Sequence, residues 1–278
     1  MKKSILLWLL AFVITFAVAV YQRVTGPTYP LSDSIEFSQS EISYKFNRSH
    51  STSSDYNLTI FAPSKNISGY FYWRRLNSSD DWQEVKMSRN NDELRVVLPR
   101  QKAAGKVNYY VKLSVNESEI YLPESKSVII RFKGDVPTFV LILHVFGMFG
   151  AMMLSTRTGL EFFNNEPNHV KLTYWTLGFL FLGGLILGPI VQKYAFDAYW
   201  TGFPFGHDLT DNKTAVAFIG WLAAFFMYRR SKRPVKWALF ASILLLIIYL
   251  IPHSLLGSEL DYNKIENQKN ILKEIVED

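Results

Sequence analysis

Cysteine is absent from the 278-residue sequence, and this absence excludes several kinds of site at once. Without thiols the chain has no disulfides, no thiolate metal ligands and no cysteine nucleophile. An exported domain must therefore fold on its hydrophobic core alone. A segment of about 110 residues is large enough to supply such a core.

The familiar catalytic signatures are missing as well. The sequence contains no P-loop, no dinucleotide fingerprint, no HExxH and no GxSxG elbow. Nucleic-acid binding is not expected despite a net charge of +6, because the basic residues form neither one face nor a long basic arm. We therefore do not expect an enzyme of a familiar class, although an activity without a motif stays open.

The mean hydropathy of +0.05 is an average over two different compositions. Residues 23–136 are polar and strand-like, whereas most of the remainder is apolar in blocks long enough to cross about 30 Å of hydrocarbon. The predicted fold class is therefore a membrane α-helical bundle of about five spans that carries an all-β sandwich.

Five apolar segments are predicted to span the membrane. The first, residues 1–22, starts with two lysines and has no small-residue cleavage site directly after its apolar run, which favours an uncleaved signal anchor. The other four form a membrane domain of residues 137–257, with spans at about residues 137–155, 172–192, 213–229 and 235–252.

Lysine and arginine in the short loops predict the orientation. Most of them fall on one side of the predicted membrane: Lys2, Lys3, Arg157, Lys171, Arg229, Arg230, Lys232, Arg233 and Lys236. The positive-inside rule then places the N-terminus in the cytoplasm, and residues 23–136 and the C-terminus outside it. Six Asn-x-Ser/Thr sequons would be glycan acceptors in a eukaryotic secretory pathway, but in a chain rich in asparagine, lysine and serine we attribute them to chance. We therefore expect a bacterial inner membrane protein with a periplasmic sandwich.

Short runs of alternating apolar and polar residues, separated by turn residues, fill residues 23–136. The predicted strands are residues 34–38, 41–46, 56–61, 70–74, 82–85, 93–98, 107–113 and 128–132. Short strands at this spacing, without helices between them, indicate an antiparallel sandwich.

Part of this strand pattern resembles fibronectin type III-like (Ig-like) modules of bacterial exported proteins. The similarity lies in Tyr70-Phe71-Tyr72-Trp73-Arg74, Asp81-Trp82-Gln83-Glu84-Val85 with Met87, Leu98-Pro99, and Gly105-Lys106-Val107-Asn108-Tyr109-Tyr110-Val111. The resemblance implies a spacer or a binding surface, and it transfers no catalytic residue. The membrane part resembles, more faintly, uncharacterised bacterial multi-pass proteins with a periplasmic sandwich, which implies no mechanism.

The positions of the histidines are the remaining indication of chemistry. His144 lies in the second span about 10 Å below its outer end, His253 ends the fifth span on that side, and His207 lies in the outer loop beside Asp208. Neutral imidazole is the commonest transition-metal ligand and an axial ligand of haem. The sequence thus offers His144 and His253 as cofactor ligands, and these two with His207 and Asp208 as a metal site. The alternative is that each histidine is an ordinary structural or solvated residue.

Several segments allow two interpretations each. Residues 208–211 are either an N-cap and acidic first turn for the fourth predicted span, or part of the metal site named above. Residues 200–206 fold back at the interface, where they pack under the sandwich or line a quinone or lipid pocket. Arg157 and Glu161 form a surface pair or a substrate-facing charge. Residues 258–278 are predicted to form a periplasmic amphipathic helix that lies on the membrane or on a partner. The glycines of the third span predict either close helix packing or self-association.

Two functions fit these observations. In the first, an integral envelope protein uses its periplasmic sandwich to bind another protein or a glycan, as an accessory or structural subunit of a membrane assembly. In the second, a redox or metal-handling membrane protein holds haem or a transition metal with its outer-face histidines. Transport is the weakest class, because no predicted span carries a charged residue between its ends. The expected partners are membrane lipid and an envelope protein.

Overall fold

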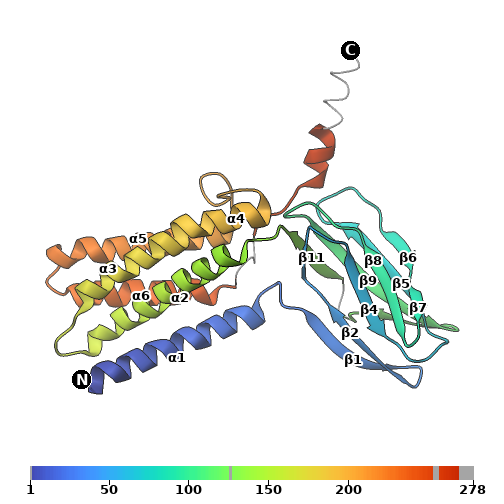
Figure 1. The fold of residues 1–278 in the computed structure, drawn as a ribbon, viewed down its shortest axis with the longest axis horizontal. Coiled ribbons are helices and arrows are strands. Elements are labelled where there is room, and N and C mark those ends of the chain that lie inside the picture. Colours follow the sequence, from blue (N-terminus) through green and yellow to red (C-terminus); the bar gives the residue numbers. More distant parts are fainter. Residues whose placement is uncertain (1, 125–126, 253–256, 269–278) are drawn as a thin grey trace, which may run out of the picture. The chain divides into compact units, whose positions relative to one another are not determined.

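The chain divides into two compact units in a computed structural model that describes residues 2–124, 127–252 and 257–268 (Figure 1). The membrane unit comprises Met1–Pro27 and Val136–Ser258, and the sandwich unit comprises Thr28–Asp135 and Glu259–Asp278. In sequence, the sandwich is thus an insertion after the first helix. The segment from Glu259 onward belongs to the sandwich unit and not to the membrane unit.

Helices make up the membrane unit. They are α1 (Lys2–Thr25), α2 (Thr138–Leu160), the 3-10 turn η1 (Glu161–Phe163), α3 (His169–Phe179), the π-helical η2 (Leu180–Leu187), α4 (Gly188–Phe196), α5 (Leu209–Arg230) and α6 (Pro234–Leu250). The three elements α3, η2 and α4 form one continuous helix. Each of the five predicted spans coincides with one of the resulting helical segments.

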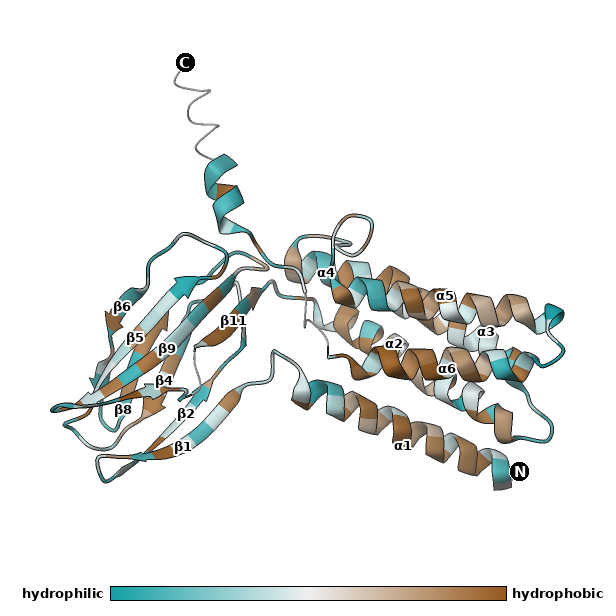
Figure 2. Ribbon diagram, turned by 180° about the vertical axis from the view of Figure 1, so that it is seen from behind, coloured by the Kyte–Doolittle hydropathy of each residue, from teal (hydrophilic) through white to brown (hydrophobic). Residues whose placement is uncertain are grey.

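Three of these helical segments are long and apolar enough to cross a membrane: Lys3–Thr25, Thr138–Phe163 and His169–Phe196. The helix Pro234–Leu250 is apolar but shorter. Figure 2 shows hydrophobic residues along these helices, and the outward side chains of α1 and α2 include many exposed leucines, valines and phenylalanines. Such a surface is unfavourable in water and suits hydrocarbon, so the helices support membrane insertion.

Glycine allows two of these helices to approach closely. A Cβ atom on Gly147 of α2 would lie 2.8 Å from the Cα atom of Gly183 in η2, and one on Gly183 would lie 2.9 Å from the Gly147 carbonyl carbon. Small residues at such a crossing let the backbones touch. The predicted close packing is therefore confirmed at Gly183, whereas a Cβ on Gly178 would meet nothing within 4 Å.

Arg157 and Glu161 form the predicted ion pair, but the pair is not on the surface. The guanidinium NH1 donates to Glu161 Oε1, and the two side chains are only 4% and 1% exposed. The expectation of a surface pair is wrong because the spacing of the two residues shows only that they meet. It does not show that α1 and the turn after α2 cover them.

The described residues of the sandwich unit form eleven strands in two sheets. The strands are β1 (Leu31–Phe37), β2 (Ser40–Phe46), β3 (Ser49–Ser51), β4 (Tyr56–Phe61), β5 (Ser68–Arg75), β6 (Gln83–Lys86), β7 (Ser88–Asn90), β8 (Glu93–Leu98), β9 (Lys106–Val115), β10 (Ser118–Leu122) and β11 (Val128–Lys133). One sheet has the order β1-β2-β4-β8-β7, and the other has the order β3-β11-β9-β5-β6 with β10 beside β9. Every predicted strand corresponds to an observed one, and the two sheets are consistent with the predicted sandwich.

The sandwich core lies between the inner faces of these strands. Strand β9 alternates buried and partly exposed residues along its whole length, so Val107, Tyr109, Val111 and Leu113 are buried. The Tyr109 ring packs against the rings of Phe46 and Phe71 in this core. The Tyr109 hydroxyl donates a hydrogen bond to the Asn47 carbonyl oxygen at 2.8 Å. A core of this size needs no disulfide, as the absence of cysteine requires.

The described part of the C-terminal segment packs on the sandwich. Residues 262–268 are helical. Glu259 accepts a hydrogen bond from Lys106 Nζ at 2.6 Å, and Glu266 accepts one from Arg75 NH2 at 2.5 Å. The predicted amphipathic segment is thus held by side chains of the chain's own sandwich, a contact that the sequence did not predict.

Candidate functional site

Asp208 precedes α5 and caps it. Its Oδ1 accepts a hydrogen bond from the Thr210 backbone N–H at 2.8 Å, and its Oδ2 accepts two from the Ser258 N–H and hydroxyl, both at 2.8 Å. The predicted N-cap is therefore confirmed. Both carboxylate oxygens hold the start of α5 and the residues that follow α6.

Asp211, in the first turn of α5, fixes the loop of residues 200–206. Its Oδ2 accepts hydrogen bonds from the backbone N–H groups of Thr201 at 2.7 Å and Gly202 at 3.0 Å, and from the Gln192 side chain at 3.1 Å. Hydrogen bonds to an ionised carboxylate are among the stronger ones in proteins. The polar residues at this end of the membrane unit therefore have structural partners.

His144 is bonded to a neighbouring helix. Its Nδ1 lies 2.9 Å from the carbonyl oxygen of Gly183, in the π-helical η2, where the backbone pairing departs from the α pattern. His207 is exposed just before α5, and His253 lies outside the described residues. Within residues 2–124, 127–252 and 257–268, no three His, Asp or Glu side chains are grouped so that they could hold a metal ion. The metal and haem sites stay predictions.

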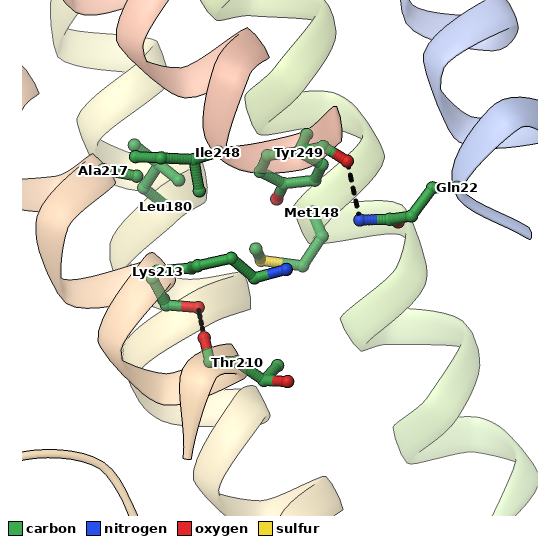
Figure 3. Close-up of a pocket in the computed structure, with 9 residues that line it drawn as sticks. Gln22, Met148, Leu180, Thr210, Lys213, Ala217, Ile248 and Tyr249 are labelled. Atoms are coloured by element: carbon green, nitrogen blue, oxygen red, sulfur yellow. Dashed lines mark hydrogen bonds between the residues drawn. The ribbon is translucent and has the colours of Figure 1, made fainter. Parts of the chain in front are cut away.

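A small cavity lies near the end of α6 (Figure 3). Its volume is about 20 Å³, which is enough for one water molecule. Lys213, from α5, donates to the Ile251 carbonyl oxygen at 2.7 Å, and Gln22, from α1, donates to the Tyr249 carbonyl oxygen at 2.9 Å. Tyr249 lies in the last turn of α6 and Ile251 is its C-cap, where the carbonyl groups have no donors within the helix. Both side chains thus cap α6 and tie it to α5 and α1.

The outer face of the six-stranded sheet carries a cluster of aromatic side chains. On β5 and β9, Tyr72 and Tyr110 are directly opposite in register. Their rings stack with centroids 4.8 Å apart and planes at 9°. We call this surface the aromatic face and define it by Tyr70, Tyr72, Trp82, Tyr110 and Tyr121.

Cationic side chains flank the aromatic face. The Arg74 guanidinium lies 4.8 Å from the centroid of the Trp82 ring, and Lys112 Nζ lies 5.6 Å from that of Tyr70. Glu84 accepts a hydrogen bond from the Tyr72 hydroxyl, and this bond is the main cause that raises the pKa of Tyr72 to about 12. The surface therefore presents aromatic rings, positive charge and a carboxylate together.

Sequence analysis used the strands of this face only as evidence for the fold. The signal was nevertheless present, because Tyr70, Tyr72 and Arg74 alternate with the core residues Phe71 and Trp73. An antiparallel sheet usually has one apolar and one solvated face, so aromatic residues on both faces of one strand are informative. The outward aromatic residues therefore require an explanation other than the core.

No model of a known protein family matches this chain, and no curated protein and no solved structure matches it. The resemblance of the strand pattern to fibronectin type III-like modules therefore stays a prediction. The function has to be argued from the geometry of the two units.

Proposed function

We propose that this chain is an integral membrane protein whose sandwich binds a partner protein through the aromatic face, as an accessory or structural subunit of an envelope assembly. The observation that carries this proposal is the cluster of tyrosine and tryptophan rings beside Arg74 on an outward sheet surface. Tyr, Trp and Arg are enriched among the residues that dominate binding energy at protein interfaces.

The ring geometry favours a protein partner over a glycan. A sugar stacks on the open face of an aromatic ring. Here the faces of Tyr72 and Tyr110 are stacked on each other, and Arg74 covers a face of the Trp82 ring. One face of each of these three rings is thus already occupied, which reduces the area for sugar stacking and leaves ring edges and hydroxyl groups that suit a protein surface.

The contacts of the C-terminal segment support the predicted topology. Because Glu259 and Glu266 bind the sandwich, the chain must cross the membrane an even number of times between Asp135 and Glu259. Four crossings, by α2, the continuous α3–α4 helix, α5 and α6, meet this condition. With a cytoplasmic N-terminus, the sandwich and the C-terminus then lie in the periplasm of a bacterial inner membrane.

Single cysteines test this topology without background, since the chain has none of its own. A membrane-impermeant maleimide added to intact spheroplasts should label Lys264→Cys in the C-terminal segment. It should label Glu166→Cys, in the loop between α2 and α3, only after the cells are lysed. Labelling of both variants from the same side would contradict the proposed topology.

A photo-crosslinking experiment in native membranes tests the partner. A benzophenone amino acid replaces Tyr121 on the aromatic face or, as a matched control, Val97 on the other sheet; both residues are 50% exposed. We expect a light-dependent protein adduct from position 121 and none from position 97. The adduct should disappear when Trp82→Ala and Tyr110→Ala are added.

The second step uses the purified proteins. Once the adduct identifies the partner, Trp82→Ala should weaken its Kd for the full-length protein by roughly 30-fold, as expected for a central aromatic residue. An unchanged melting temperature would show that the variant is folded. Equal adducts from positions 121 and 97, or a carbohydrate adduct, would refute the proposal.

A further inference from the structure

The membrane unit contains a large cavity that the proposed function does not use. The cavity has a volume of about 960 Å³ and lies between α1, α2 and α3. This volume is at the upper end of the range typical of small-molecule sites. Two aromatic residues from each helix form part of its wall: Trp8 and Phe12, Phe146 and Phe149, Trp175 and Phe179.

One end of the cavity is polar, and its central residue is Arg157. The side chain is only 4% exposed. Its NH1 donates to Glu161, and its NH2 lies 3.4 Å from the Ser4 hydroxyl, but its Nε is buried without a hydrogen-bond partner. This Nε atom is closed to solvent, so a ligand in the cavity would meet the guanidinium through NH2, whose contact with Ser4 is long at 3.4 Å.

Glu161 does not compete for such a ligand, because it is already bonded within the chain. Its Oε1 accepts from Arg157, and its Oε2 accepts from the Asn168 N–H at 2.7 Å and the Asn164 amide at 3.1 Å. The charges of Arg157 and Glu161 therefore cancel. The guanidinium NH2 carries two N–H groups and makes one long contact, so it retains donor capacity toward a ligand.

The length of the cavity matches one leaflet of a bilayer. Phe146 and Arg157 both line it and are eleven residues apart on α2. At a rise of 1.5 Å per residue this is about 16 Å, or about half of the 30 Å hydrocarbon core. The aromatic part thus has the depth of an acyl chain, and the polar part is at the level of a headgroup.

The remaining charges at the polar end are of both signs. Lys171 and Glu166 line the cavity and are exposed. The lining therefore has no net charge, and it offers a cation and an anion at the headgroup level. A headgroup with a phosphate and an ammonium complements this pair better than a purely anionic one.

We infer that this cavity binds one zwitterionic phospholipid with a primary ammonium headgroup. Its acyl chain lies along the aromatic wall, and a phosphate ester oxygen accepts a hydrogen bond from the NH2 group of Arg157. Lys171 faces the phosphate, and Glu166 faces the ammonium. The site is independent of the aromatic face, so either proposal stands if the other fails.

Native mass spectrometry of the full-length protein tests this inference. The protein is released from nanodiscs that contain equal amounts of phosphatidylethanolamine, phosphatidylcholine and phosphatidylglycerol. Leu154→Trp places a bulky ring inside the cavity, and Leu143→Trp, an exposed position on the same helix outside the cavity, is the matched control. The double variant Arg157→Gln with Glu161→Gln removes the buried charges together.

The wild type and Leu143→Trp should each retain one phosphatidylethanolamine per chain. Leu154→Trp should retain none, and the double variant should retain at least tenfold less. A wild type that retains no lipid, or lipids in the proportions of the nanodisc, would overturn the inference even if a variant fails to fold. Preferential retention of phosphatidylglycerol or phosphatidylcholine would overturn the assignment of the headgroup.

Discussion

Replacing Tyr262 with alanine should release the C-terminal segment from the sandwich. The side chain is 5% exposed, and its ring centroid lies 4.6 Å from the Arg75 guanidinium carbon. Loss of a partly desolvated cation–π contact costs about 0.5–2 kcal/mol. With the apolar contacts of the ring, we expect the docking free energy to fall by about 2–3 kcal/mol. This corresponds to a roughly 30- to 150-fold increase in the population of the undocked segment.

Hydrogen exchange of the full-length protein measures this change directly. The N–H of Leu260 donates to the Ala104 carbonyl and that of residue 262 to the Asn77 carbonyl, so both amides are protected only while the segment is docked. Tyr262→Phe is the control, because it loses only the hydroxyl contact with Gln101 at 3.3 Å and should cost no more than about 1 kcal/mol. Unchanged exchange at both amides in Tyr262→Ala would refute the reasoning.

Two further predictions concern helix packing and pH. Gly147→Ala should destabilise the membrane unit by about 1–3 kcal/mol, because the added methyl group would collide with the backbone of Gly183. Gly178→Ala should be neutral or stabilising, because a Cβ at that position meets nothing within 4 Å. Thermal unfolding in detergent compares the two variants. Partial burial raises the pKa of Glu259, but the hydrogen bond from Lys106 and further contacts lower it more, so its pKa in the docked state is below 4.5. The contribution of Glu259 to docking of the C-terminal segment is therefore complete above pH 4.5 and is lost as the pH falls through the docked-state pKa. Amide hydrogen exchange of the segment should rise over that pH interval in the wild type but not in Glu259→Gln.

Periodicity predicted most of the fold. Apolar blocks identified the five helical segments, and alternation identified eight of the eleven described strands, because both patterns report directly which face of an element is buried. Strands β3, β7 and β10 were missed: β3 and β7 have three residues each, too few to show an alternation, and β10 is exposed along most of its length. The fold class was therefore predictable to the level of helices and a sandwich, while the shortest sheet edges were not.

Contacts between elements were less predictable than the elements themselves. The spacing of Arg157 and Glu161 predicted their pairing, but their burial depends on α1 and on residues 164–168, which lie far away or in a loop. Docking of the C-terminal segment depends on one aromatic residue, Tyr262, and on charges whose partners lie more than 150 residues away. No local pattern contains such information.

The buried charges of the membrane unit differ in how fully the chain satisfies them. The Asp211 carboxylate accepts several hydrogen bonds from one loop and from Gln192, and the Lys213 ammonium is held by a helix carbonyl; a structural role accounts for both. Arg157 differs, because it lines the large cavity, its Nε is buried without a hydrogen-bond partner and its NH2 contact with Ser4 is long. Charge inside a membrane is costly and is retained where it has a partner or a function. Arg157 thus keeps donor capacity beside an aromatic cavity, at the depth at which we propose a lipid headgroup.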